Sequence, residues 1–240
     1  MGKDRPRPGA TERAQPLIAP SERLYGRTRG HTLRPRQAEL LAKTLPRLRI
    51  DPLDPWAGAA TRWLEIGFGA GEHAAAQAAA HPDATLVSCE VFEPGICSLL
   101  SRLVPEYADP ATAPLPPNLR VWDDDARPLI RAAPDGSLDR AFLLFPDPWP
   151  KARHAKRRFV TPERVAEMAR VLRPGAEWRI ASDDPTYQEW TAQVLERQTL
   201  FYGREPAGVR PDDWFATRYE AKARAAGRTP LYWTLRRASP

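Results

Sequence analysis

Short apolar runs alternate with longer amphipathic stretches over most of this chain. The apolar runs have the length of buried strands, and we expect strands at 62–66, 84–90, 119–122, 141–145 and 176–181. The stretches between and after them favour helices at 72–80, 94–104, 127–132, 162–172 and 185–197. Strands that alternate with helices predict a doubly wound, parallel α/β sheet, which binds its ligands at the carboxyl ends of the strands.

Both ends of the chain depart from this alternation. Residues 1–22 hold four prolines and show no apolar periodicity, so we expect a disordered tail followed by one domain over 23–240. A helix is predicted from Pro35, because leucines recur on one face up to Leu48. Near the other end we expect a strand at 200–202, a helical stretch at 213–226 and a strand at 231–236. The last two strands are expected to complete the sheet as a hairpin-like pair.

Charge is concentrated near the N-terminus. The chain has a net charge of +6 and a pI near 9.6, and residues 1–49 carry twelve Lys or Arg against four Asp or Glu. Residues 23–36 contain five arginines and Tyr25. This composition is typical of an arm that reaches along nucleic acid, although a solubilising linker would have the same composition.

Other classes of protein are disfavoured by composition. No window approaches about 18 uninterrupted apolar residues and the N-terminus lacks the apolar core of a signal peptide, so we expect a cytoplasmic protein without a membrane partner. Cys89 and Cys97 are the only cysteines, and the four histidines are scattered. We therefore expect neither a disulfide framework nor a metal site.

The densest chemistry follows the strand at 141–145. Pro146, Pro148 and Pro150 stop the strand and stiffen the chain, which holds Asp147 and Trp149 on a rigid lip. Behind the lip comes a dense cationic cluster of Lys151, Arg153, His154, Lys156, Arg157 and Arg158. We expect Arg153, Lys156, Arg157 and Arg158 to form a basic patch that binds RNA. A carboxylate and an indole backed by cations suit a base held for chemistry beside its phosphates. A proline-rich turn with a solubilising loop remains the alternative.

Two further features favour a nucleoside ligand. Gly67 and Gly69 form a glycine-rich turn after the first strand, where the backbone can pass close to a ligand. Glu65 precedes that turn and could face a cationic cofactor, whereas Glu90 ends the second strand, where a carboxylate can accept both ribose hydroxyls. Asp123, Asp124 and Asp125 end the third strand, where Asp125 is within reach of an adenine, although three acids in a row could equally form a helix-capping turn. NAD and S-adenosylmethionine both fit these residues.

The combination of motifs resembles the bacterial tRNA (guanine-N7)-methyltransferases, most specifically through the run Phe145–Arg158. The other matching motifs are Leu64-Glu-Ile-Gly-Phe-Gly, Cys89-Glu-Val, Asp125-Ala, Ala181-Ser-Asp and Thr217-Arg-Tyr-Glu. The resemblance implies a Rossmann-like methyltransferase sheet, mostly parallel with an antiparallel C-terminal strand. It also implies that the enzyme methylates the variable-loop guanosine of tRNA, at tRNA position 46, in the cytoplasm.

The resemblance further assigns site residues. It implies that S-adenosylmethionine is bound by Glu65, Glu90, Asp125 and Asp147, with Gly67 and Gly69 in the turn beside it. Asp147 is also the expected catalytic residue. Substrate contacts are implied for Lys151, Asp183, Thr217, Arg218, Tyr219 and Glu220. Ser182, Arg218 and Tyr219 are mild departures from the residues commonest in the family.

The expected chemistry asks little of the protein. Ring nitrogen 7 of guanine carries a lone pair and no proton, so methyl transfer needs alignment of the reactants and no general base. A carboxylate such as Asp147 or Asp183 can stabilise the cationic product, and Trp149 could stack on the base. Neither a metal nor a protein partner is called for. Three alternatives remain: an NAD-dependent oxidoreductase, an RNA-binding module without turnover, and a methyltransferase with another substrate.

Overall fold

A computed structural model describes residues 28–51 and 53–239 of the 240-residue chain. The predicted disordered tail and the first part of the basic arm, including Tyr25, lie outside the described residues. The strands are β1 (Thr61–Ile66), β2 (Ala84–Cys89), β3 (Leu119–Trp122), β4 (Leu138–Leu144), β5 (Leu172–Ser182), β6 (Phe201–Tyr202) and β7 (Leu231–Arg237). The α-helices are α1 (Pro35–Lys43), α2 (Leu45–Leu48), α3 (Glu72–Ala80), α4 (Glu93–Leu103), α5 (Ala126–Ala132), α6 (Pro162–Val171), α7 (Pro185–Glu196) and α8 (Arg218–Ala225).

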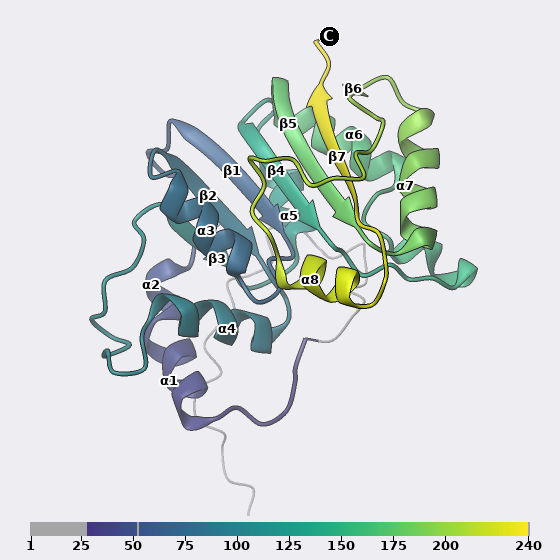
Figure 1. The fold of residues 1–240 in the computed structure, drawn as a ribbon. Coiled ribbons are helices and arrows are strands. Elements are labelled where there is room, and N and C mark those ends of the chain that lie inside the picture. Colours follow the sequence, from purple (N-terminus) through teal and green to yellow (C-terminus); the bar gives the residue numbers. More distant parts are fainter. Residues whose placement is uncertain (1–27, 52, 240) are drawn as a thin grey trace, which may run out of the picture.

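The strands form one seven-stranded sheet in the order β3-β2-β1-β4-β5-β7-β6 (Figure 1). Strands β1 to β5 are parallel to one another, whereas β7 is antiparallel to both β5 and β6. This confirms the predicted mostly parallel, doubly wound sheet with an antiparallel C-terminal strand. The last two strands pair as expected, but β7 lies inside the sheet and β6 at its edge.

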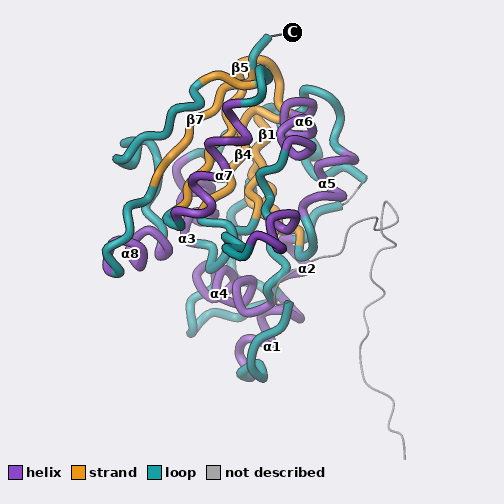
Figure 2. Tube along the Cα trace, turned by 90° about the vertical axis from the view of Figure 1, so that its right-hand side faces the viewer, coloured by secondary structure: helices purple, strands orange, loops and turns teal. Residues whose placement is uncertain are grey.

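Helices cover both faces of the sheet (Figure 2). Helices α5, α6 and α7 bury one core against the strands, in which Leu143, Met168 and Trp178 are at most 2% exposed. On the other face, α1 to α4 pack over β1, β2 and β3, and their core contains Trp63 and Phe142. Two apolar layers on one sheet explain why the strands read as nearly continuous apolar runs.

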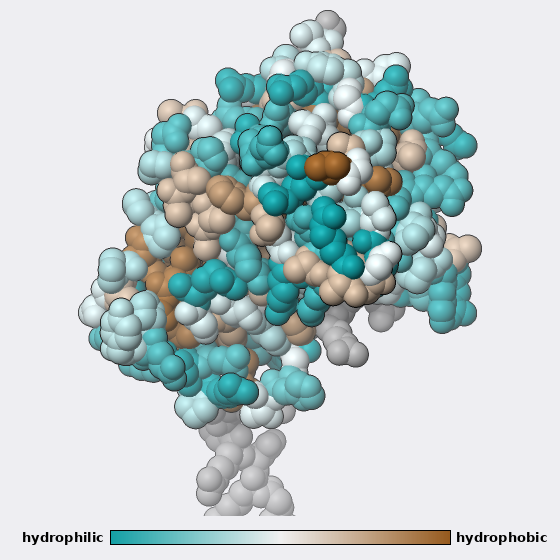
Figure 3. Space-filling view, viewed as in Figure 1, coloured by the Kyte–Doolittle hydropathy of each residue, from teal (hydrophilic) through white to brown (hydrophobic). Residues whose placement is uncertain are grey.

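Among residues 28–51 and 53–239, no helix covers the outer part of the second face, over β5 and β7 (Figure 1). There the segment that leads to α8 crosses the strands, and its Trp214 packs on Ala181 and Tyr232. Hydrophilic side chains gather over this segment in the space-filling view (Figure 3). Arg179 of β5 holds the segment from below through Asp213. The predicted helix at 213–226 therefore begins only at Arg218, because the residues before it are pinned to the sheet.

Two other boundaries differ from the sequence prediction. Strand β5 begins at Leu172 and not at Ala176, because Leu172 already pairs with Leu138 before a register shift that contains Pro174 and Gly175. The basic run after the lip, for which no helix was predicted, contains a 3₁₀ helix, η1 (Ala152–Arg157). No helix in the described part of the chain is long and apolar enough to cross a membrane.

The proline-rich stretch 105–117 is tied to α1 and α2. Arg36 donates to the carbonyls of Pro105 and Ala108, and the Thr44 hydroxyl donates to the carbonyl of Pro110. Arg47 donates to the same Pro110 carbonyl and to the carbonyl of Ala113. These side chains satisfy carbonyls that no strand or helix pairs, which fixes the stretch against the domain.

Candidate functional site

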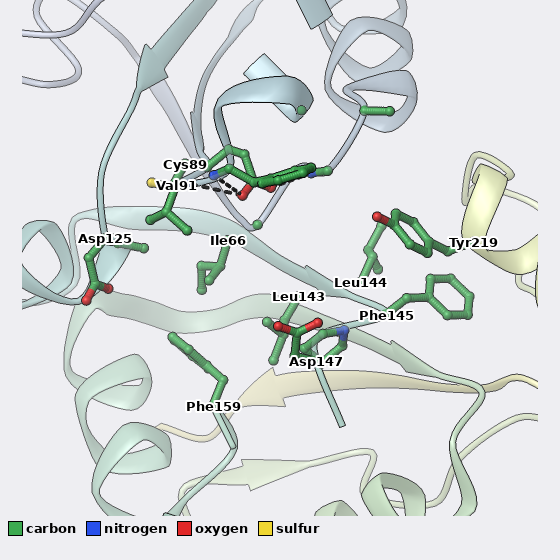
Figure 4. A pocket seen from close by; sticks show the side chains of 18 of the residues that line it. Ile66, Cys89, Val91, Asp125, Leu143, Leu144, Phe145, Asp147, Phe159 and Tyr219 are labelled. Atoms are coloured by element: carbon green, nitrogen blue, oxygen red, sulfur yellow. Dashed lines mark hydrogen bonds between the residues drawn. The ribbon is translucent and has the colours of Figure 1, made fainter. Parts of the chain in front are cut away.

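A pocket of about 740 Å³ opens at the carboxyl ends of β1, β2, β3 and β4 (Figure 4). This is where a doubly wound sheet is expected to bind its ligand. In Figure 4, Cys89 and Val91 border one side of the pocket and Asp147 and Phe159 the other. Among the residues that line it are Ile66, Gly67, Gly69, Glu90, Pro94, Asp124, Asp125, Phe145, Asp147, Trp149, Arg157, Arg218 and Tyr219.

The glycine turn between β1 and α3 forms the floor of the pocket as predicted. Gly67 and Gly69 have φ values of 74° and 59°, which residues with a side chain rarely adopt. Both the turn and α4 depend on close backbone approach, since a Cβ on Gly95 would lie 2.4 Å from the carbonyl oxygen of Gly69. Glycine at 95 therefore lets the first turn of α4 form the pocket wall.

Glu90 is held at the end of β2 by three backbone donors. Its Oε2 accepts from the N–H of Gly69 at 2.7 Å, and its Oε1 accepts from Val91 and Phe92 at 2.9 Å each. Burial raises the pKa of the Glu90 carboxyl, and these N–H groups oppose that rise. A carboxylate has about four acceptor positions, so capacity remains for a ribose hydroxyl.

Asp125 lines the pocket but its carboxylate already serves the fold. It is the N-cap of α5, where it accepts from the backbone N–H of Arg127 at 2.9 Å and pairs with the Arg127 guanidinium at 2.5 Å. The neighbouring Asp124 is exposed and also lines the pocket. Two acidic residues thus line the pocket at the end of β3, and the helix that follows holds Asp125 in place.

Asp147 and Trp149 lie on the proline lip that follows β4. The lip begins where the N–H of Phe145 donates to the carbonyl of Ala181, at 2.8 Å. Phe145 and Trp149 both have positive φ, of 52° and 45°. This backbone conformation is energetically unfavourable for residues other than glycine. Between these two residues, the carboxylate of Asp147 points into the pocket (Figure 4).

The indole of Trp149 has cationic neighbours. The guanidinium of Arg157 lies over its ring at 4.9 Å, and His154 meets it edge-on at 5.8 Å between ring centroids. Desolvation lowers the pKa of the His154 imidazole, and neighbouring cations lower it further by a smaller amount. Stacking of a base on Trp149 stays a prediction, and Arg157 occupies one face of the ring.

Glu65 is buried and is not among the residues that line the pocket, so its cofactor contact stays a prediction. It is 2% exposed, its Oε1 lies 2.8 Å from Nδ1 of His73, and its Oε2 accepts from the hydroxyl of Ser88 at 2.9 Å. Gln77 continues this network at 3.0 Å from the other nitrogen of His73. Side chains alternate along a strand, so β1 turns Ile66 toward the pocket and Glu65 toward α3.

The predicted substrate segment closes one end of the pocket from α8. Arg218 and Tyr219 line the pocket, and Tyr219 packs so closely on the glycine turn that a Cβ on Gly69 would lie 3.0 Å from its ring. Thr217 instead caps the helix by accepting from the N–H of Glu220 at 3.1 Å. Glu220 is 6% exposed and forms ion pairs with Arg210 and Arg224.

The other predicted substrate and RNA residues are spread along one side of the lip. Lys151, Arg153 and Lys156 are exposed, whereas Arg158 is only 7% exposed and turns inward. Arg158 therefore contributes little to the exposed surface of the basic run. Asp183 follows β5 outside the pocket wall and pairs with Arg228 at 2.6 Å.

The arm that precedes α1 reaches the same pocket. The N–H of Glu93 donates to the carbonyl of Thr28 at 3.0 Å, and a Cβ on Gly30 would lie 2.5 Å from Pro94 of the pocket wall. The sequence did not lead us to expect the arm beside Pro94. The Pro94-Gly95 pair at the start of α4 could have indicated it, because the arm packs against Pro94 at Gly30 and the glycine turn packs against Gly95 at Gly69.

Comparison with known proteins agrees with this architecture. Residues 59–232 match a family model described as "Putative methyltransferase". The chain is 65% identical over 226 residues to the tRNA (guanine-N(7)-)-methyltransferase of Granulibacter bethesdensis, a match that covers 94% of this chain and 97% of that protein. The protein of the same name from Rhodospirillum rubrum is 43% identical over 231 residues, with 90% and 88% covered.

Solved structures share the fold. The 16S rRNA methyltransferase KamB aligns with a TM-score of 0.50 at 19% identity, over 75% of this chain and 90% of that chain. An antibiotic-related methyltransferase aligns with a TM-score of 0.53 at 9% identity, over 76% of this chain and 90% of that chain. At these identities the likeness concerns the arrangement of helices and strands.

Proposed function

This chain belongs to the family of tRNA (guanine-N(7)-)-methyltransferases, and we propose that the guanosine it methylates lies in the variable loop of tRNA, at tRNA position 46. It is an S-adenosylmethionine-dependent enzyme that methylates ring nitrogen 7 of guanine in tRNA. The choice of the variable loop rests on the resemblance carried by the run Phe145–Arg158, and the observation that carries the chemistry of methyl transfer is the direction of Asp147. Its carboxylate projects into the same pocket that Glu90 and the glycine turn form for a nucleoside.

The residues present fit S-adenosylmethionine. Glu90 would hold the ribose with its remaining acceptor position, and the turn at Gly67 and Gly69 allows the backbone to lie against the ligand. Asp124 and Asp125 border the adenine end, and the pocket volume lies within the usual range for ligands of this size. Bound there, the cofactor would supply an electrophilic methyl group on its sulfonium sulfur.

Asp147 is proposed as the catalytic residue. Methylation leaves a positive charge on the guanine ring, and a carboxylate fixed beside the ring stabilises that charge as it develops. The prolines and the strained residues around Asp147 restrict its motion, so little reorganisation is needed when the charge appears. Ring nitrogen 7 has no proton to remove, so Asp147 would act by stabilising positive charge and not as a general base.

The surroundings of the pocket suit a polyanionic substrate. Arg157 and Arg218 line the pocket from η1 and from α8, so cations approach it from two elements. Lys151, Arg153 and Lys156 extend the positive charge along η1. We propose that these three exposed cations contact tRNA phosphates, and that Asp183 and the segment that begins α8 contact the displaced guanosine.

Transfer to a defined nucleotide tests the proposed function. We expect purified protein, unmodified tRNA transcript and methyl-labelled S-adenosylmethionine to give 7-methylguanosine after digestion of the RNA. A transcript with adenosine in place of the variable-loop guanosine is the matched control and should take up no label. Label in another nucleoside, or equal label in the control transcript, would contradict the assignment of the variable loop.

Acidification is expected to weaken cofactor binding through Glu90. Because burial raises the pKa of this carboxyl, its protonated form appears at a higher pH than for an ordinary glutamate. The protonated group loses acceptor capacity for the ribose, so affinity should fall as the pH falls through this raised pKa. Calorimetric titration with S-adenosylmethionine at decreasing pH measures the effect.

Glu90→Gln serves as the control for that titration. This variant should bind S-adenosylmethionine about tenfold or more weakly, because a hydrogen bond to a charged group is lost, and its affinity should vary little with pH. An unchanged acid dependence in Glu90→Gln would assign the titration to another group.

A further inference from the structure

Arg158 differs from the other cations of the basic run in its surroundings. It is 7% exposed, whereas Arg153 and Lys156 on the same run are exposed to solvent. A long cationic side chain is rarely buried unless its charge and donors are satisfied. What Arg158 contacts therefore indicates what it does.

Its guanidinium binds the backbone of the lip. Nε donates to the carbonyl of Pro148 and Nη2 donates to the carbonyl of Trp149, both at 3.1 Å. These two carbonyls belong to residues 146–150, which form neither helix nor strand and whose three prolines have no N–H. Arg158 thus supplies this segment with cross-links that its own backbone lacks.

The same guanidinium is anchored to the core from its other side. Its central carbon lies 4.8 Å from the ring centroid of Trp190 on α7. The indole N–H of Trp190 in turn donates to the carbonyl of Val160 at 2.5 Å, two residues after Arg158. A planar guanidinium can stack on an indole and donate in its own plane at once, which a lysine ammonium cannot do.

The conformation of the lip requires such an anchor. Trp149 has a φ of 45° and Phe145 a φ of 52°, and residues in this region persist only where surrounding structure holds them. Arg158 grips the carbonyl of one of these strained residues. Asp147 lies between the two, and its direction into the pocket depends on both.

We propose that Arg158 is a positioning residue, whose guanidinium ties the lip to α7 and so aims Asp147 into the pocket. It does not act as an RNA-binding cation. This inference rests on the proposed function for its kinetic consequence, because a misplaced Asp147 matters only if that carboxylate acts in methyl transfer. Its structural consequence, a loosened lip, does not depend on activity.

Arg158→Lys tests the proposal, because it keeps the charge and removes the planar fork. We expect the single-turnover rate with saturating tRNA transcript and S-adenosylmethionine to fall about 10- to 100-fold, as for a displaced catalytic group. The dissociation constant for tRNA and its salt dependence should stay within about twofold, since the charge is kept and the group is buried. A variant that weakens tRNA binding and keeps the rate would overturn the proposal.

Arg170→Lys is the matched control. Arg170 also donates to consecutive backbone carbonyls, those of Ile130 and Arg131, but it does so between α5 and α6, away from the lip. We expect this variant to lose thermal stability to a degree comparable with Arg158→Lys and to keep the wild-type rate. Equal rate losses in both variants would assign the effect of Arg158→Lys to general destabilisation.

Two further measurements separate this inference from the proposed function. In an Asp147→Asn background, Arg158→Lys should lower the rate little further, whereas independent, multiplying losses would mean that Arg158 does not act through Asp147. Amide hydrogen exchange of Phe145, whose N–H donates to the carbonyl of Ala181 where the lip begins, should be faster in Arg158→Lys than in the wild type even if neither forms 7-methylguanosine. Unchanged exchange at this amide would overturn the inference while leaving the proposed function intact.

Discussion

Asp147→Asn is expected to lower kcat for methyl transfer to tRNA about 10²- to 10³-fold, the usual loss when one preorganised electrostatic group is removed from an active site. Asparagine keeps the size of the side chain but cannot stabilise the positive charge of the methylated ring. Asp147 is exposed and lies on a lip that its neighbours hold, so the variant should fold normally. Rapid-quench measurement of 7-methylguanosine in a single turnover gives the rate directly.

The binding steps provide the control for this prediction. Affinity for S-adenosylmethionine should change far less than the rate, since Glu90 is untouched. Asp83→Asn, which alters an exposed aspartate at the opposite end of β2, should retain wild-type turnover. Wild-type turnover in Asp147→Asn would remove this residue from the mechanism and leave Asp183 as the carboxylate to test.

Glu65→Ala is expected to lower the free energy of unfolding by about 3–5 kcal/mol, the cost of removing one partner from a buried polar pair. The substitution leaves His73 and Ser88 without the carboxylate to which both are bonded, in a region closed to water. For a chain of this size the melting temperature should fall by about 10 °C. Thermal unfolding followed by circular dichroism measures the change.

The same variant decides between two roles for Glu65. Glu65→Gln keeps one acceptor oxygen and should lose less stability than Glu65→Ala. If Glu65 contacted the cofactor, both variants would bind S-adenosylmethionine much more weakly at an unchanged melting temperature. That result would contradict the position of Glu65 behind β1.

The alternation of strands and helices was sufficient to predict the sheet and the position of the pocket. Parallel strands place their carboxyl ends at one edge, so Glu90, Asp125 and Asp147 could be expected to meet there from sequence alone. The structure brings all three to one pocket. What sequence could not supply is the direction of each carboxylate, which depends on the turn that follows the strand.

Glu65 and Arg158 show why direction and burial were harder to predict. Glu65 occupies a strand end like Glu90, but strand alternation turns it to the face beneath α3, where His73 lies in the first turn of that helix. Arg158 stands in a run of cations that is typical of a solvated surface. Its partners are two carbonyls ten and nine residues away and an indole on α7, and no local pattern records those contacts.

The order of the last strands has a consequence for the nascent chain. Strand β6 is synthesised before β7 but pairs only with β7, which itself pairs with β5. Until β7 emerges, the outer edge of β5 has no partner, and β6 has nothing to join. Unpaired strand edges invite association with other chains, so this protein is most vulnerable to misassembly in the interval between synthesis of β5 and insertion of β7.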